Sequence, residues 1–297
     1  MSKSGKKSQL KEVGMKRAIH AWCALLVMLL ACRSAGAEET VILMASTIGP
    51  IDAGIISVME DAYEKETGSR VRHVGAGTGE ALKIAEQGSV DLVMVHAKAL
   101  EEKFVAAGFG TERIPFMYND FIIVGPANDP AGIKGMASAT GALKKIAASQ
   151  ARFVSRGDRS GTHVAETDLW VKADVKPSGP WYTVYEKGNE GNAATLRYAD
   201  QQGAYTVIDR ATWLSLEKSI NLKVLVEKDE ALLNYITLIP VNPKKFPKVN
   251  HEATKAFVRW LTSPAKGQVI VRDFGKERYG APLFFPNSDA WRTGSVK

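Results

Sequence analysis

The sequence predicts an α/β fold made of two lobes. Apolar strand-like runs alternate with amphipathic helix-like segments along most of the chain. Two strand-like runs, near 121–126 and 236–243, end in proline, as expected where a chain crosses between lobes. The length of 297 residues is enough for two ordinary domains. Because strands and helices alternate, we expect a parallel sheet with helices covering its faces.

The first series of elements begins at residue 40. Strands are expected at 40–46, 69–76 and 90–97, and helices at 54–68, 79–88 and 100–108. Glycine is a common residue just after a helix, so Gly68 and Gly88 are the expected ends of the first two helices. The stretch 121–130 then forms a strand that ends in proline and aspartate.

A second series follows, with a helix near 137–149, a strand at 152–157 and a helix at 162–174. The remaining segments are 191–203, 204–210, 222–227, the strand 232–243, the helix 251–264 and a short tail at 274–285. We therefore predict lobe 1 from 38–122 plus 238–297, and lobe 2 from 123–237. Four tryptophans in apolar contexts are expected in the core: Trp170, Trp181, Trp213 and Trp260.

The N-terminal segment 1–37 is typical of a secretory signal peptide. Two basic residues, 16–17, precede an apolar run at 18–31, and Ala35-Gly36-Ala37 forms a small-residue cleavage signal. The mature protein would begin at Glu38 and act in the periplasm without any cysteine, since both cysteines fall in the leader. Met15 is an alternative start, and "LLAC" ending at Cys32 is an alternative lipoprotein signal.

The charge distribution argues against a nucleic-acid partner. The formal net charge is +7, but residues 1–37 contain seven of the 39 basic residues and only one of the 32 acidic residues. The rest of the chain has 32 basic and 31 acidic residues, so it presents no excess of positive charge to a polyanion.

The stretch "SRGDRSGTH" (155–163) lies between a predicted strand and a predicted helix. The first amides of a helix have no intrahelical partner, and the helix dipole places partial positive charge there. Ser160 and Thr162 add hydroxyl donors, Gly161 allows close approach, and Arg156 supplies a full charge. These groups suit a tetrahedral oxyanion, although an ordinary turn in which Ser160 caps the helix explains the spacing equally well.

Two other strand ends have similar chemistry. "GAGTGE" (75–80) offers Thr78 and Gly79, but it lacks the lysine that would complete a nucleotide-binding loop. "ASTIGP" (45–50) offers Ser46 and Thr47. Three hydroxyl- or glycine-rich strand ends in one α/β chain are more than ordinary loop chemistry predicts.

Other functions have weaker support. Ser160 and His163 lie on one helical face and could form part of a serine hydrolase, but no third group and no "GxSxG" motif is visible. The four histidines after residue 37 lack the spacing of metal ligands. Asp209 and Arg210 follow a strand, where a helix N-cap or a buried ion pair is the expected role.

Three longer stretches resemble one known family, the tungstate-binding proteins of bacterial ABC importers. They are "VGAGTGEALKIAEQGSVDLVMVHAKALEEKFVAAG", "PFMYNDFIIVGPANDPAGIKG" and "FVSRGDRSGTH", and the resemblance covers nearly all of 40–287. It implies the type II periplasmic-binding-protein fold, in which two α/β lobes joined by two crossover segments enclose a ligand cleft. It also implies that hydroxyls, backbone amides and an arginine hold bare tungstate, without a cofactor or a free metal cation.

Carried over by motif, the resemblance assigns Arg156 and Thr162 to the ligand, with Ser160 beside them, and Thr78 and Gly79 to the glycine-rich turn. The chain departs from the family in two places. The first strand of the family ends in Thr-Thr-Thr-Ser, whereas this chain has Ser46-Thr47-Ile48-Gly49. "GNEGNAAT" (188–195) replaces a more glycine-rich turn that contains methionine.

The expected function is therefore that of a monomeric, non-enzymatic solute-binding protein. It would bind tungstate, or molybdate, and deliver it to an inner-membrane ABC permease with its cytoplasmic ATPase. A site for phosphate or sulfate remains an alternative, because Asp158 could accept the proton of hydrogen phosphate.

Overall fold

The computed structural model describes residues 41–294 of the chain. The predicted signal peptide, its cleavage site and Cys32 lie outside the described residues. No helix within 41–294 is long and apolar enough to cross a membrane.

The main sheet has eight strands, in the order β10-β4-β9-β3-β1-β2, with β7 and β8 also paired to β4. Strands β5 and β6 form a separate two-stranded sheet. The strands are β1 (Val41–Thr47), β2 (Arg70–Ala76), β3 (Leu92–Val95), β4 (Ile114–Gly125), β5 (Phe153–Ser155), β6 (Tyr182–Val184), β7 (Thr206–Asp209), β8 (Lys223–Val226), β9 (Leu233–Pro240) and β10 (Phe285–Pro286).

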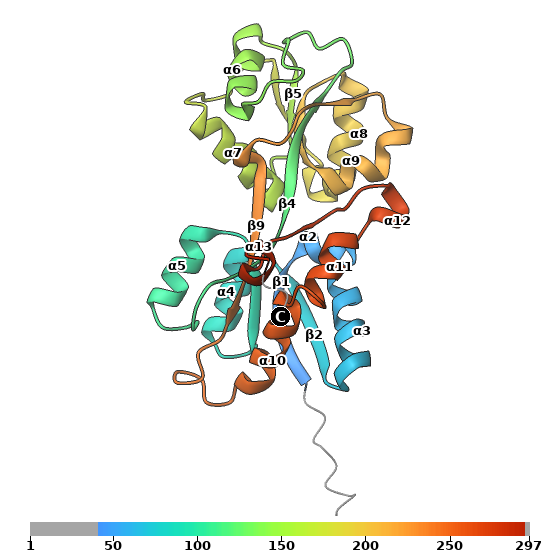
Figure 1. The fold of residues 1–297 in the computed structure, drawn as a ribbon. Helices are drawn as coiled ribbons and strands as arrows, with labels where there is room; N and C mark the ends of the chain where they lie inside the picture. The colour runs from blue at the N-terminus through green and yellow to red at the C-terminus, as the bar shows by residue number, and fades with distance from the viewer. Residues whose placement is uncertain (1–40, 295–297) are drawn as a thin grey trace, which may run out of the picture. The chain divides into compact units, whose positions relative to one another are not determined.

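Helices cover the sheet and fill the connections between strands (Figure 1). They are α2 (Ile48–Ala53), α3 (Ile55–Thr67), α4 (Thr78–Glu86), α5 (Lys98–Ala106), α6 (Ala139–Ser149), α7 (Gly161–Lys172), α8 (Asn192–Gln202), α9 (Arg210–Leu216), α10 (His251–Thr262), α11 (Gly267–Asp273), α12 (Lys276–Tyr279) and α13 (Asp289–Arg292). Three single 3₁₀ turns occupy 188–190, 217–219 and 230–232.

Strands β3 and β4 have hydrophobic cores on both faces of the main sheet. Along β3, Leu92 and Met94 belong to one hydrophobic core, whereas Val93 and Val95 belong to another on the opposite face. Side chains of a strand alternate between faces, so a strand covered on both sides must be apolar throughout. Residues 121–124 of β4 alternate in the same way between two further cores.

Strands β4 and β9 are the segments that link the two predicted lobes, and Figure 1 shows them side by side. The first part of β4, up to Asp120, pairs with β9, and the part from Phe121 onward pairs with β7 and β8. These two strands correspond to the two proline-terminated runs in the sequence. The lobe boundaries at 122/123 and 237/238 stay a prediction, and the names lobe 1 and lobe 2 refer to these ranges.

The expectation of a parallel sheet was only partly correct. Strands β1, β2 and β3 are parallel, but β9 pairs antiparallel with β3 and β4, and β7 and β8 pair antiparallel with β4. The sheet is therefore mixed. The alternation of strands and helices could not reveal this, because strand direction depends on which strands become neighbours.

Several elements differ from the expected bounds. Strand β4 begins at Ile114, well before the expected 121, because its first half pairs with β9. Helix α3 follows the prediction closely, since Gly54 and Gly68 bound it at its two ends. The short elements α2, β6, α11, α13 and β10 were not predicted, and the 274–285 tail contains α12.

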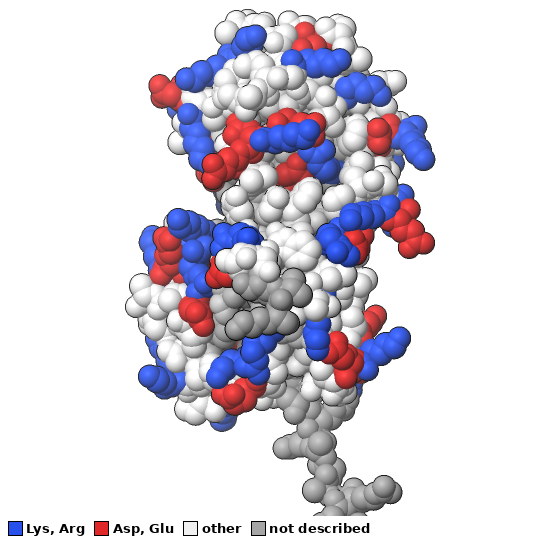
Figure 2. All heavy atoms as spheres, viewed as in Figure 1, with Lys and Arg blue, Asp and Glu red and all other residues white. Residues whose placement is uncertain are grey.

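The core prediction for the tryptophans is confirmed. Trp170, Trp181, Trp213 and Trp260 are all at most 9% exposed. On the face shown in Figure 2, acidic and basic side chains are interspersed over the described surface rather than gathered by sign.

Candidate functional site

The carboxyl ends of β1, β2 and β3 lie at one edge of the sheet. Ser46 of β1 is in register with Gly75 of β2 and with Met94 of β3. The chain therefore leaves all three parallel strands at the same level. In open α/β sheets, ligands bind beside the carboxyl ends of the strands, so the groups that follow these strands are the candidates for one site.

Two threonine hydroxyls at this edge are buried without a hydrogen-bond partner. They are Oγ1 of Thr47, the last residue of β1, and Oγ1 of Thr78, the first residue of α4. Leaving a buried polar group unsatisfied costs about 1–3 kcal/mol. Neither hydroxyl caps a helix, so the fold gives them no structural role, and a ligand oxygen would satisfy both.

The other predicted residues at this edge do not leave a buried donor without a partner. Ser46 is fully buried, and its Oγ donates to the Thr47 carbonyl at 3.3 Å. A side chain added at Gly79, in the first turn of α4, would meet no atom within 4 Å. Ile48, which stands where the resembling family has a hydroxyl, is 45% exposed. Of these predicted residues, Thr47 and Thr78 thus offer the donors that the fold leaves unused.

The "SRGDRSGTH" turn joins β5 to α7 and is held by its own polar groups. Asp158 Oδ1 accepts the backbone N–H of Ser160 at 3.0 Å, and His163 Nδ1 accepts the backbone N–H of Arg159 at 2.8 Å. Gly157 has a φ of +74° and lies against Val184, so only glycine fits there without strain. Hydrogen bonds within the protein thus hold the turn in this conformation.

Arg156 is anchored at three of its five N–H groups. Nη2 pairs with Asp158 Oδ2 at 2.8 Å, Nε donates to the Gly188 carbonyl at 3.0 Å, and Nη1 donates to Asn192 Oδ1. Its side chain is only 14% exposed. A guanidinium carries five donors, so two N–H groups remain for a ligand. Gly188 is required because a side chain there would collide with the Arg156 carbonyl.

Two of the three partners of Arg156, Gly188 and Asn192, come from the segment 188–195 that departs from the resembling family. Asn192 in turn donates to Asp209 Oδ2 at 2.6 Å, and Asp209 caps α9 by accepting the N–H of Thr212. The expected N-cap role of Asp209 is therefore confirmed. Arg210 forms the expected ion pair, with Asp120 and Glu227.

Helix α7 starts at this turn. Ser160 Oγ accepts the His163 N–H at 3.4 Å. Ser160 therefore caps the helix, as expected if the stretch is an ordinary N-cap turn. Gly161 is the first helical residue, and Thr162 is 6% exposed. A Cβ on Gly161 would lie 3.1 Å from Cε1 of His96. Because His96 directly follows β3, this contact brings the start of α7 to the strand edge of Thr47 and Thr78.

The same geometry does not support the hydrolase alternative. Ser160 Oγ is engaged by a backbone amide, and His163 Nδ1 by the amide of Arg159. A catalytic base must instead bond to the nucleophile and be oriented by a third group. Burial lowers the pKa of His163, but in the described part of the chain its ring makes no hydrogen bond to Ser160. Within 41–294 there is also no cluster of three or more His, Cys, Asp or Glu side chains that could hold a metal ion.

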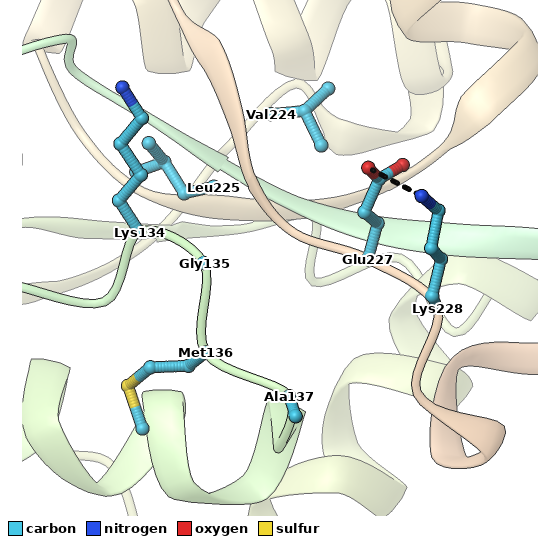
Figure 3. Close-up of a pocket in the computed structure, with 8 residues that line it drawn as sticks. All are labelled: Lys134, Gly135, Met136, Ala137, Val224, Leu225, Glu227 and Lys228. Carbon is cyan, nitrogen blue, oxygen red and sulfur yellow. Dashed lines mark ion pairs between the residues drawn. The ribbon is translucent and has the colours of Figure 1, made fainter.

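A pocket of about 430 Å³ lies elsewhere, between the loop before α6 and strand β8 (Figure 3). It is lined by Lys134, Gly135, Met136, Ala137, Val224, Leu225, Glu227 and Lys228. Figure 3 shows Glu227 and Lys228 turned toward each other at one side. None of the predicted site residues lines this pocket.

Comparison with known proteins identifies the family. The model of the PBP superfamily domain matches residues 34–265. The tungstate-binding protein TupA of Peptoclostridium acidaminophilum is 41% identical over 288 residues, which are 92% of this chain and 99% of that protein. The chain belongs to the TupA family of the PBP superfamily.

Solved structures of TupA-type proteins agree with this assignment. The tungstate-binding protein TupA from Desulfovibrio alaskensis G20 is 43% identical, with a TM-score of 0.77, over 84% of this chain and 100% of that one. The structure of the tungstate ABC transporter from Geobacter sulfurreducens is 41% identical, with a TM-score of 0.67, over 80% and 99%. The predicted α/β fold of the type II periplasmic-binding-protein class is confirmed.

Within this TupA-family chain, two residues near the candidate site, His96 and Asn192, were not predicted from the sequence. Asp158 was expected only as a partner for a protonated ligand, whereas it pairs with Arg156. His96 had a detectable signal, because it lies at the carboxyl end of the third parallel strand, as Thr47 and Thr78 lie at or just after the ends of the other two. Asn192 had none, since it is 36 positions from the arginine that it binds.

Proposed function

We propose that this protein is a periplasmic solute-binding protein that captures tungstate, or molybdate, and delivers it to an inner-membrane ABC permease with its cytoplasmic ATPase. The main support is the pair of buried, unpartnered hydroxyls of Thr47 and Thr78 beside the start of α7. The family membership points the same way, because the related proteins are named for tungstate binding.

The proposed ligand set comes from both lobes. Lobe 1 would contribute the ends of β1 and β2, and lobe 2 the turn and first residues of α7. Its members are Ser46, Thr47, Thr78, Gly79, Arg156, Ser160, Gly161 and Thr162. The chemistry is binding alone: hydroxyls, helix amides and one guanidinium surround a doubly charged anion, and exclusion of water strengthens each contact. We propose no catalytic step, and we expect a monomer.

The hydrogen bonds of the Asp158 carboxylate favour tungstate over phosphate as the ligand. Hydrogen phosphate carries a proton and needs an acceptor, whereas tungstate is fully deprotonated at neutral pH and needs donors only. Both oxygens of Asp158 already accept bonds within the protein, one from Arg156 and one from the Ser160 N–H. The carboxylate therefore supports the arginine instead of facing a ligand proton.

A thermal-melt panel tests this function. Purified mature protein is heated with tungstate, molybdate, sulfate or phosphate, each over a range of concentrations. A ligand at 100 times its dissociation constant should stabilise the fold by about 2.7 kcal/mol. We expect tungstate and molybdate to raise the melting temperature at much lower concentrations than phosphate. Absence of a shift with all four anions would reject the proposal, and turnover of simple esters would favour the hydrolase instead.

The export pathway needs a separate measurement. The leader 1–37 should be removed during export, so that intact-mass analysis finds a protein beginning at Glu38. A lipid-modified Cys32 would show instead that the protein is anchored to the membrane surface.

A further inference from the structure

We propose that His96 is a ligand-binding residue of the oxyanion site, in which its imidazole donates an N–H to the anion. This inference rests on the proposed function, and it adds a side chain from the third strand to a site otherwise built from β1, β2 and α7.

The position of His96 in the sheet is the first support. It is the residue directly after β3, and Met94 two positions earlier is in register with Ser46 of β1. His96 therefore leaves the sheet at the edge where Thr47 and Thr78 keep their unpartnered hydroxyls. All three parallel strands then end in a side chain that can donate a hydrogen bond.

The contact with α7 is the second support. A Cβ built on Gly161 would lie 3.1 Å from Cε1 and 3.6 Å from Nε2 of His96. The Cε1–Nε2 edge of the ring thus faces the first residue of α7, where helix amides lack intrahelical acceptors. An anion held by these amides would lie within reach of the imidazole.

The surroundings of the ring are the third support, because they differ from those of His73 and His163. His73 Nδ1 binds Glu60 Oε1 at 2.9 Å, and His163 Nδ1 accepts the N–H of Arg159 at 2.8 Å. Within the described residues, the His96 ring has no side-chain partner of this kind and hydrogen-bonds only with its own backbone. No side chain bonds to the ring edge that faces Gly161, so a group that arrives from outside can bind there.

The loop that bears His96 is nevertheless firmly placed. The fully buried carboxylate of Glu101 accepts the N–H of Ala97 at 2.6 Å. The same carboxylate pairs with Arg113 Nη2 at 2.7 Å and accepts the Thr237 hydroxyl at 2.6 Å. This network fixes the backbone of the residue that follows His96.

The protonation state of His96 suits a donor role. Burial lowers the pKa of the imidazole, while a hydrogen bond to its own backbone and the charge of Glu101 act in the opposite direction. The lowered pKa favours the neutral imidazole, which carries one N–H. A neutral donor can bind a deprotonated oxyanion without the desolvation cost of a buried imidazolium.

Calorimetry of three variants at pH 7.5, with sodium tungstate as ligand, tests the proposal. His96→Ala should weaken tungstate binding about tenfold, the value of one hydrogen bond to a charged group. His96→Gln retains a neutral N–H donor and should recover part of that affinity. His251→Gln, on α10 and outside the site, is the matched control and should bind as the wild type does.

Nitrogen-15 NMR of the histidine side chains in the wild type provides a readout that does not depend on how the variants fold. Tungstate should move the ring nitrogen signals of His96 and leave those of His251 in place. If the wild type binds tungstate but the His96 signals do not move, or His96→Ala keeps full affinity, His96 is not a ligand and the proposed function stands. If the wild type binds none of the four oxyanions, the proposed function fails, and this inference fails with it.

Discussion

The two halves of the candidate site are held in different ways. At the strand edge of lobe 1, the hydroxyls of Thr47 and Thr78 are buried and have no partner. In the turn of lobe 2, Arg156 and Asp158 bind each other and nearby backbone groups. Lobe 1 therefore keeps donors unused at a cost in stability, whereas lobe 2 uses most of its donors to hold one arginine in place.

This difference has a consequence for mutations. Removing a hydroxyl from lobe 1 takes away a proposed ligand contact and also removes an unsatisfied buried group. Removing the arginine from lobe 2 takes away a proposed ligand contact and leaves its former partners unsatisfied. The two changes should weaken binding alike but move stability in opposite directions.

The largest expected effect is that of Arg156→Ala. We expect at least a tenfold loss of tungstate affinity, because a charge-assisted hydrogen bond contributes about 1.5–3 kcal/mol. The free energy of unfolding should also fall by about 2–3 kcal/mol, since Asp158 would lose its partner. Arg156→Lys should recover only part of the affinity, because a lysine lacks the guanidinium fork.

Calorimetry and urea unfolding measure the two quantities for each Arg156 variant. Wild-type affinity in Arg156→Ala, together with loss of binding in Thr162→Ala, would show that the arginine is purely structural.

Thr47→Val and Thr78→Val should show the opposite pattern. Each removes one hydroxyl with little change in shape, so tungstate affinity should fall about tenfold. Stability without ligand should stay the same or increase, because a buried polar group without a partner has been removed. The same two measurements apply, and a clear loss of stability without ligand would mean that these hydroxyls have a structural role.

A smaller effect is expected from restoring the hydroxyls that the family has after β1. Ile48→Thr combined with Gly49→Ser should tighten tungstate binding by about threefold or more if the new groups reach the anion. Gly49 has room, since a Cβ there meets no atom within 4 Å. Gly49→Ala is the control, because it adds bulk without a hydroxyl. Equal affinities of the control and the double variant would show that added hydroxyls contribute nothing.

The smallest effect on binding is expected for Glu166, a residue of α7 whose carboxyl group accepts a hydrogen bond from Ser155 at the end of β5. Burial raises its pKa to about 7, although Ser155, Tyr182 and Trp170 donate to its carboxylate. The folded state thus keeps this proton at a higher pH than the unfolded state. Between about pH 4.5 and 7 the unfolded state binds fewer protons, so the free energy of unfolding should fall as pH rises.

Urea unfolding of the wild type and Glu166→Gln across this pH range isolates the contribution of that carboxyl. The difference between the two proteins should change with pH, and tungstate affinity should change little. A constant difference would indicate that the hydrogen bonds keep Glu166 ionised throughout.

Much of the local structure could be predicted because it depends on residues close together in the chain. Gly54 and Gly68 bound α3, and Ser160 caps α7, where the sequence placed a helix after a turn. The apolar run that became β3 is buried on both faces. Each feature follows from a short pattern of side chains, so it did not require knowledge of the neighbouring strands.

For the candidate site, the sequence indicated Thr47, Thr78 and the 155–163 turn through their chemistry at strand ends. It did not indicate which donors would be used within the protein. Arg156 and Asn192 meet only because the 188–195 segment folds over the turn. The sequence therefore identified candidate groups. It could not predict which hydrogen bonds each group makes, because the partners come from distant parts of the chain.

The tertiary structure alone decided the mixed direction of the sheet and the meeting of His96 with Gly161. These two residues are far apart in sequence, and no local pattern specifies which strand edge a distant helix will approach. Strand order and helix packing are set by how the apolar faces of remote segments bury one another. Local side-chain patterns determined the elements and their donors, whereas packing between distant segments determined which of these elements meet.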